Sequence, residues 1–466
     1  MAVNLSVKGI DPKDPAYQPM LENLQANILK SHARDFVRIL FLQFQADDDA
    51  VKAWIRQFSN DRVKSAQDQQ RAIEARRAAK ANNGSFDGGL IANFYLTAEG
   101  YEDLGFDADH LKERNRSFIE GMKSSRVRRE LSDPPVEQWQ AEYRKNLDAM
   151  ILLADDDDNT LAAAAEEVKA SLNGIAAVVA EEKGADLKDP IVPGGHEHFG
   201  YKDGISQPRF FTDDLDKAQK DNIDLNVTQW NPLQPLEIVL VKDPFTGKQD
   251  DNYGSFLVYR KLEQDVEGFN AKVADLARHL TLTPNQEANG VSAEDYAGAL
   301  VVGRFKDGTP LVNADIRLRR SPAPNDFDYK KMDPKGHICP FHAHIRKTNP
   351  RGQGFLVPER FITRRAIPYG RPKTDDKKGL LFMCFQSSVE RQFNFIQNTW
   401  SNAPGFPPLR GNPGIDPLTG QGHKGGQSWP KRYGSEDEVK FDFTGFIHMQ
   451  GGEYFFAPSL GFLRNL

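Results

Sequence analysis

The spacing of apolar residues predicts strands alternating with helices in the first half of the chain. Residues 35–44 are rich in β-branched and aromatic side chains, which is typical of a buried strand. A polar, Ala-rich stretch at 47–81 favours a solvated helix, and residues 90–96 predict a second strand. Thr97 and the acidic residues after it are typical of a helix start.

The same alternation returns further along the chain. The predicted strands are 149–154, 175–180, 237–241, 254–260 and 379–386, and the predicted helices are an Ala-rich one ending near 172, 263–280 and 388–400. Strand–helix–strand units in both halves indicate an α+β fold of two sandwiches whose strands can pair antiparallel. The similar order of elements in the two halves is consistent with an internal duplication.

Two stretches rich in Pro and Gly interrupt this pattern. The shorter one, at 189–195, separates the halves, so we expect an N-terminal domain at 1–192 and a C-terminal domain at 193–466. The longer one, at 403–434, is too rich in Pro and Gly for regular structure, and we expect a surface excursion or a lid.

Composition narrows the class of protein. The chain has 466 residues, 39% of them hydrophobic, which is typical of a globular protein. Its formal charge is −6, so it lacks the overall positive charge that would attract nucleic acid. Two cysteines make neither a disulfide framework nor a four-cysteine zinc site, which favours a reducing compartment. The start lacks the pattern of a secretory signal, and no apolar run approaches the roughly 20 residues of a membrane helix. We therefore expect a soluble cytoplasmic protein.

A run of aspartates suggests calcium at first sight. Asp155, Asp157, Asn159 and Glu166 fall at positions 1, 3, 5 and 12 of an EF-hand loop. However, Thr160 replaces the glycine that makes the sharp turn of such a loop. We therefore favour acids that cap a helix start.

The segment 337–351 concentrates three histidines, one cysteine, two arginines and a lysine. If the segment is extended, His342 and His344 point to the same face and could hold zinc or iron with a distant carboxylate and Cys339. The alternative is that these histidines only pack or form hydrogen bonds.

Two other clusters carry candidate chemistry. In Gly200-Tyr-Lys-Asp-Gly204, glycines bracket an acid, and Gly204 would let the backbone lie against a flat ligand; the alternative for Asp203 is an ordinary Asp-Gly turn. In Arg364-Arg-Ala-Ile-Pro-Tyr-Gly370, two arginines precede an apolar corner, and a buried arginine there should face an acid or an anion.

Together, these three clusters resemble the dye-decolourising peroxidases, haem enzymes of the dimeric α+β (ferredoxin-like) superfamily. The segment 339–351 is similar to the proximal-ligand block of the larger family members. Further agreement lies at 21–29, 379–386, 395–400 and 451–459, so the resemblance covers essentially the whole chain in order.

The resemblance implies that the two domains are ferredoxin-like and that His344 is the axial ligand of a haem b iron. His342 would then be a neighbour and Cys339 a packed thiol. On the open face it places Asp203 as proton carrier and Arg364 as the cation that stabilises developing charge. Because aspartate is a weaker base than histidine, an acidic optimum is expected.

Other roles follow from the same resemblance. Arg365 is the fallback for Arg364 or a contact of a haem propionate, and Arg346 is a further candidate for a propionate. Glu390 is a candidate partner of the axial histidine. Tyr369 and Trp400 are candidate relays of electrons from bulky donors, although either could simply be core.

The expected function is a haem peroxidase that reduces hydrogen peroxide and oxidises bulky aromatic donors such as dyes and phenolics. The alternatives are a haem-binding or haem-transfer protein, and a non-haem metalloenzyme that uses His342 and His344. Neither nucleic acid nor a membrane is expected as a partner, and the oligomeric state is open between monomer and dimer.

Overall fold

The structure is a computed structural model that describes residues 3–82, 87–109, 112–188, 195–215, 229–246, 251–354, 357–372, 374–409, 411–422 and 426–466. The predicted domain boundary between 192 and 193 lies outside these residues. None of the helices in these ranges is long and apolar enough to span a membrane.

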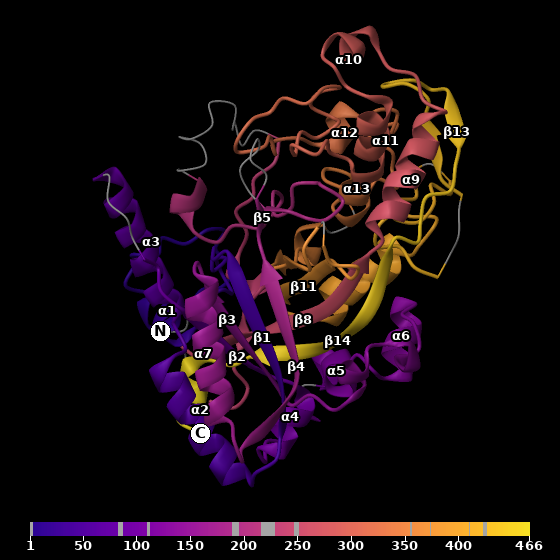
Figure 1. Ribbon diagram of the computed structural model, residues 1–466. Helices are drawn as coiled ribbons and strands as arrows, with labels where there is room; N and C mark the ends of the chain where they lie inside the picture. The colour runs from indigo at the N-terminus through magenta and orange to yellow at the C-terminus, as the bar shows by residue number, and fades with distance from the viewer. Residues whose placement is uncertain are drawn as a thin grey trace.

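The N-terminal half consists of one set of strands with helices outside it (Figure 1). Its elements are α1 (Gln18–Asn23), β1 (Phe36–Phe44), α2 (Asp48–Asp61), α3 (Ala66–Ala81), β2 (Ile91–Leu96), α4 (Ala98–Asp103), α5 (Lys112–Glu120), α6 (Ser125–Leu131), η2 (Val136–Gln138), η3 (Ala141–Arg144), β3 (Ala149–Asp155), α7 (Asp158–Ser171), β4 (Ala176–Ala185), β5 (Leu187–Lys188) and β6 (Gly195–His196). The strand order β4-β1-β3-β2 is antiparallel throughout.

The C-terminal half repeats this plan with longer insertions. Its elements are η4 (Leu236–Ile238), β7 (Val241–Lys242), β8 (Tyr253–Gln264), α9 (Val266–Ala277), α10 (Pro284–Ala288), α11 (Ala293–Val302), α12 (Tyr329–Met332), α13 (His344–Thr348), η5 (Val357–Arg360), β9 (Thr363–Arg364), β10 (Ile367–Tyr369), β11 (Gly379–Gln386), η6 (Glu390–Asn394), η7 (Ile396–Ser401), β12 (Ser428–Pro430), β13 (Glu438–Lys440), β14 (Ile447–Ala457) and α14 (Leu460–Leu463).

The order of the four main strands is the same in both halves. With strands numbered from the start of each half, the N-terminal order 4-1-3-2 is matched by β14-β8-β11-β10. The predicted fold class, two ferredoxin-like units with antiparallel sheets and peripheral helices, is therefore confirmed.

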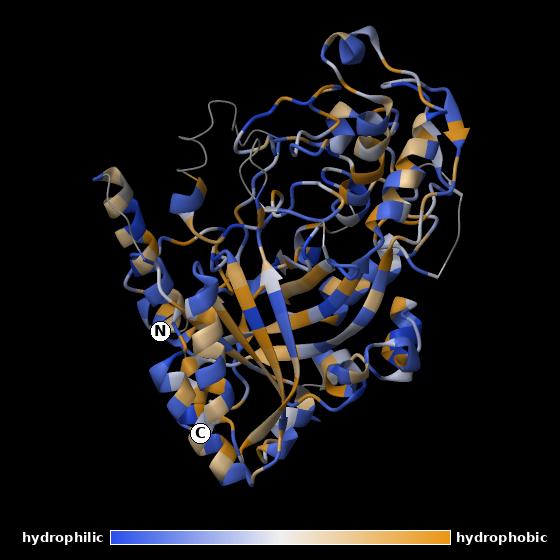
Figure 2. Cartoon of the chain, in the orientation of Figure 1, coloured by the Kyte–Doolittle hydropathy of each residue, from blue (hydrophilic) through white to orange (hydrophobic). Residues whose placement is uncertain are grey.

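The two units join into one barrel-like sheet. On one side β14 pairs with β2 at Phe456 and Leu96. On the other side β4 meets β10, where a side chain at Gly184 would collide with Ile367. Figure 2 shows that the N-terminal strands are mostly apolar, and the largest core cluster contains strand residues from both halves.

Local capping explains several boundaries. Asp47 and Thr97 accept backbone N–H groups of α2 and α4 at 2.9 Å. Asp157 accepts the Thr160 N–H at 2.7 Å, so the aspartate run caps α7, as favoured over calcium. Glu166 is instead paired with Lys169.

Some predicted elements differ from the structure. The stretch 47–81 forms two helices, α2 and α3, and 237–241 is not a strand but the end of η4 followed by the short β7. The predicted helix 388–400 exists, but η6 and η7 are π-helical. Such wide turns occur often at functional sites, and here residues of η7 line the cavity described next.

Candidate functional site

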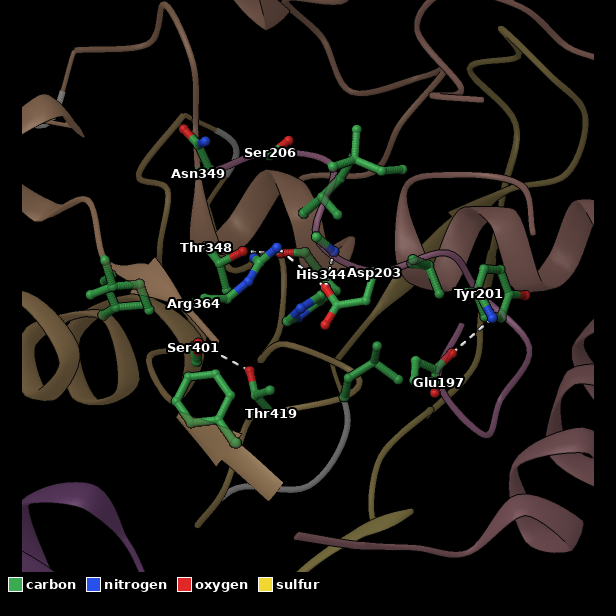
Figure 3. A pocket seen from close by; sticks show the side chains of 18 of the residues that line it. Glu197, Tyr201, Asp203, Ser206, His344, Thr348, Asn349, Arg364, Ser401 and Thr419 are labelled. Carbon is green, nitrogen blue, oxygen red and sulfur yellow. Dashed lines mark hydrogen bonds and ion pairs between the residues drawn. The ribbon is translucent and has the colours of Figure 1, made fainter. Parts of the chain in front are cut away.

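A cavity of about 1610 Å³, including space open to solvent, lies in the C-terminal half. Its walls are largely apolar, with side chains from β8, β11, η6, η7 and β14, among them Leu262, Phe382, Phe393, Ile396 and Ile447. Polar groups enter from two sides, and Figure 3 shows His344, Asp203 and Arg364 gathered at its centre.

His344 is the first residue of α13 and is held by a buried carboxylate. Its Nδ1–H donates to Oδ2 of Asp416 at 2.9 Å, and Asp416 is fully buried. The other carboxylate oxygen accepts the N–H groups of Leu418 and Thr419 at 2.8 and 3.0 Å. With Nδ1 engaged, Nε2 is the nitrogen left for a ligand in the cavity.

The contact between His344 and Asp416 shifts the pKa values of both side chains. Burial alone lowers the pKa of His344, but the adjacent Asp416 carboxylate outweighs burial and the pKa rises above its ordinary value. Burial raises the pKa of Asp416, but His344 and the two backbone donors lower it by more than burial raises it. The net pKa lies below the ordinary value, so Asp416 remains a carboxylate. A carboxylate partner of this kind raises the basicity of a histidine that binds a metal.

Asp416 comes from the Pro- and Gly-rich stretch 403–434. The expected surface excursion thus returns to the cavity and supplies part of its wall, through Leu418 and Thr419. Glu390, the predicted partner of the axial histidine, is wrong: its carboxylate accepts the backbone N–H of Ser117 instead.

The glycine-bracketed loop presents Asp203 to the cavity. Gly200 and Gly204 have φ angles of +89° and +75°, which side-chain-bearing residues rarely adopt. Glu197 closes the loop by accepting the N–H groups of Phe199 and Tyr201, both at 2.8 Å. Burial raises the pKa of Glu197 to about 7.

Of the neighbouring Arg364 and Arg365, Arg364 is the one that lines the cavity. Its Nη2 lies 3.3 Å from Oδ1 of Asp203, and its backbone N–H donates to Gln207 at 3.0 Å. It lies on β9 opposite Cys384 of β11, and successive residues of a strand point to opposite faces. Arg365 therefore points away.

Two arginines that were candidate cofactor contacts have other partners in the structure. Arg365 is buried and donates to the carbonyls of Asn27 and Ile28, which anchors the N-terminal segment. Arg346 is fully buried, pairs with Asp333 at 2.8 Å, and lies against the ring of Phe341. Neither lines the cavity.

Arg304, Arg351 and Arg360 line the cavity as well, and the first two form one cluster. Both donate to the hydroxyl of Ser206 and to the side-chain oxygen of Asn325, at distances from 2.7 to 3.2 Å. Neither forms an ion pair with a carboxylate of the described residues. Burial lowers the pKa of Arg304 to about 10 and, with the help of Arg304, that of Arg351 to about 9, so both remain cationic at neutral pH. Two buried cations with neutral acceptors favour an anion nearby.

The two-histidine metal site is not formed. His344 begins a helix rather than continuing a strand, and His342 is buried edge-on against Trp429, 4.3 Å between ring centres. Burial lowers the pKa of His342 to about 3 and raises that of Cys339 to about 12. Among the residues that the structure describes, no three His, Cys, Asp or Glu side chains gather in a way that could hold a metal ion.

The two candidate relay residues lie in different surroundings. Trp400 lines the cavity and stacks on Phe406 with ring centres 5.2 Å apart. Tyr369 does not line it; its ring lies 5.0 Å from the Lys261 ammonium, and its hydroxyl has no hydrogen-bond partner in the described part of the chain.

Sequence reasoning named Asp203, Arg364 and His344, which the structure brings together in one cavity, but it did not name Asp416, Arg304 or Arg351. Arg351 ends the histidine-rich segment and could have been singled out by its place there. Asp416 had no local signal beyond an aspartate followed by proline in an irregular stretch.

Comparisons with known proteins agree with this geometry. Residues 23–186 match the family model of the DyP dimeric alpha+beta barrel domain, and residues 296–405 match that of the Dyp-type peroxidase C-terminal domain. The chain is 40% identical to the multifunctional dye peroxidase DyP2 of Amycolatopsis sp., over 96% of each chain. It is 31% identical to the dye-decolorizing peroxidase msp1 of Mycetinis scorodonius, over 80% of this chain and 76% of that one.

Solved structures give the same result. The DyP-type peroxidase of Anabaena sp. is 38% identical, with a TM-score of 0.88 over 99% of this chain and 98% of that chain. The structure of DyP2 from Amycolatopsis sp., also 38% identical, has a TM-score of 0.89 over the whole of both chains. The chain belongs to the DyP-type peroxidase family, and it is a peroxidase, an oxidoreductase.

Proposed function

We propose that this chain is a haem b peroxidase that reduces hydrogen peroxide and oxidises bulky aromatic donors such as dyes and phenolics. His344 would be the axial ligand, and Asp203 and Arg364 would activate peroxide. The observation that carries the proposal is the single cavity lined by a carboxylate-paired histidine and by the Asp203–Arg364 ion pair.

The residues of the cavity fit haem. Haem b combines an apolar ring with two carboxylates, and the apolar walls and the Arg304–Arg351 pair offer a complement to both parts. Among the described residues no carboxylate pairs with either guanidinium group, and a haem propionate would supply an anionic partner beside them. Ser206 and Asn325 already hold them in place.

When bound, haem supplies the electrons for reduction of peroxide. Asp203 can accept a proton from one oxygen of hydrogen peroxide and return it to the other, which then leaves as water. Arg364 remains cationic and stabilises the negative charge that develops as the bond between the oxygens lengthens. Its 3.3 Å contact holds Asp203 beside the place where that charge appears.

Bulky donors need a route for electrons, and Trp400 is the better of the two candidates. It lines the cavity, whereas Tyr369 lies beneath a buried ammonium and has, among the described residues, no acceptor for the proton that an oxidised phenol must lose. A cation close to the ring also disfavours removal of an electron.

Absorption spectroscopy of the purified protein, followed by stopped-flow mixing with hydrogen peroxide, tests the proposal. A Soret band is expected after reconstitution with haem, and His344→Ala should lose it. Asp203→Asn and Arg364→Leu should retain haem but react with peroxide about 10²–10³ times more slowly. Asp87→Asn, in an exposed Asp-Gly turn whose carboxylate also accepts a backbone N–H, is the matched control and should react normally.

The outcomes separate the alternatives. Absence of a Soret band in the reconstituted protein would reject a haem enzyme. Haem binding with no rapid reaction with peroxide would favour a haem-binding or haem-transfer protein.

A further inference from the structure

We infer that Lys347 is a positioning residue: its ammonium binds carbonyls of the stretches 403–409 and 411–416 and thereby sets the geometry of the His344–Asp416 pair. The inference deepens the proposed function, since it rests on His344 being the axial ligand.

The ammonium of Lys347 is enclosed by backbone carbonyls. The residue is fully buried, and its Nζ donates to the carbonyls of Ala403 at 2.9 Å, Phe406 at 2.7 Å and Gly414 at 2.5 Å. An ammonium has three N–H donors, so all three are used, and none goes to a carboxylate. The three carbonyls come from three places in one irregular segment, so the lysine closes that segment into a loop.

The loop leads directly to the partner of the axial histidine. Asp416 follows two residues after Gly414, whose N–H donates to Pro404 at 3.0 Å, and the Asp416 N–H donates to Ser401 at 2.9 Å. His344 lies three residues before Lys347 in α13, and residues at this spacing are neighbours on a helix surface. One turn of α13 therefore contacts the loop twice, through the His344 imidazole and through the Lys347 ammonium.

No regular structure holds this loop at its start. Residues 403–409 and 411–416 form no helix or strand. Other side-chain anchors lie close to Asp416 itself: the Gln427 amide donates to the Ile415 carbonyl at 3.0 Å, and the Gln397 amide donates to the Thr419 carbonyl at 2.7 Å. Burying an ammonium is costly, and a hydrophobic side chain would fill the same space at a lower cost. Burial also lowers the pKa of Lys347 to about 8, which agrees with that cost. The ammonium instead fixes the conformation of the loop, because it holds three backbone carbonyls around one point.

The test compares Lys347→Met with Asp416→Asn in two measurements. In the haem-loaded ferrous protein, resonance Raman spectroscopy reports the iron–histidine stretching frequency, and Lys347→Met should shift it in the same direction as Asp416→Asn. The double variant should shift it no further than Asp416→Asn alone, because both changes act through one contact. In the haem-free protein, hydrogen exchange of the Asp416, Leu418 and Thr419 amides should rise at least about tenfold in Lys347→Met.

The matched control is Lys261→Met. Lys261 is also buried, but its ammonium bonds to Gln140 at 2.9 Å and to Glu182 at 2.6 Å inside the barrel. This variant should lose stability without a change in either measurement. If Lys347→Met does not fold, Lys347→Gln, which retains two N–H donors, replaces it in both measurements, with the same direction expected.

Lys347→Met with the wild-type stretching frequency and wild-type exchange of these amides would overturn the inference, whatever its thermal stability. Faster exchange without a frequency shift would also overturn it, since the loop would then not act on His344. If the wild-type protein shows no iron–histidine band, the proposed function fails instead, and exchange in the haem-free protein still decides whether Lys347 holds Asp416 in place.

Discussion

Replacing Asp416 by asparagine tests the role of the buried carboxylate with almost no change of shape. The asparagine oxygen can still accept the N–H groups of Leu418 and Thr419, which bond at 2.8 and 3.0 Å in the structure. Its NH₂ group then faces Nδ1 of His344, where the carboxylate now accepts at 2.9 Å. Two donors cannot share this contact, so the histidine proton must move to Nε2, the nitrogen required as ligand.

The magnitude follows from that one contact. A charge-assisted hydrogen bond contributes about 1.5–3 kcal/mol, and loss of the partner of a metal-bound histidine typically costs about 10–100-fold in affinity or activity. Because about 1.4 kcal/mol corresponds to a factor of ten, the two figures agree. We expect Asp416→Asn to bind haem about 10–100 times more weakly.

Asp416→Ala distinguishes the effect of the His344 tautomer on haem binding from the effect of losing the Asp416 side chain on stability. Alanine leaves the Leu418 and Thr419 N–H groups without their acceptor, so the haem-free variant should unfold at a lower temperature than Asp416→Asn. It places no donor beside Nδ1, however, so His344 can keep its proton there and haem should bind more tightly than to Asp416→Asn. The assay is titration of haem-free protein with haemin, followed by the Soret band, beside thermal unfolding. If Asp416→Asn binds haem within a factor of two of wild type, the reasoning from the tautomer is refuted.

Three further predictions follow from the cavity and its loop. Arg351→Met should weaken haem binding about tenfold or more while the stability of the haem-free protein stays within about 1 kcal/mol, because a buried cation with neutral partners is replaced by an apolar side chain; equal haemin affinity would contradict an anion site. Glu197→Gln should alter the pH dependence of stability. Since burial raises the pKa of Glu197 to about 7, wild type loses stability relative to this variant as pH rises from about 4.5 to 7, by at most about 1.4 kcal/mol per pH unit. Urea unfolding at several pH values measures this; a difference in free energy of unfolding between the two proteins that stays constant over this range would contradict the raised pKa. Gly204→Ala should lower the free energy of unfolding by only about 1–2 kcal/mol, because φ is +75° but no described atom lies within 4 Å of the added carbon; calorimetry showing a larger loss would indicate a steric clash.

The sequence by itself determined most of the strands and the candidate groups of the cavity. Apolar runs such as 35–44 and 149–154 predicted strands correctly because burial of a strand depends on side chains within that strand. The glycine-bracketed Asp203 and the segment around His344 were visible because their residues are adjacent in the chain. The strand 237–241 was wrong because short apolar runs also occur in buried irregular segments.

Only the tertiary structure decided which groups act together. Asp416 lies 72 residues after His344 in a segment without periodicity, so no local pattern could connect the two. Arg364 was separated from Arg365 by the pairing of β9 with β11, which sets the face to which each side chain points. Arg346 carried the same charge as Arg351, but Asp333 occupies it, whereas Arg351 faces the cavity with neutral acceptors. Which charged side chains face the cavity, and which partner each one has there, therefore depends on contacts between residues far apart in the chain.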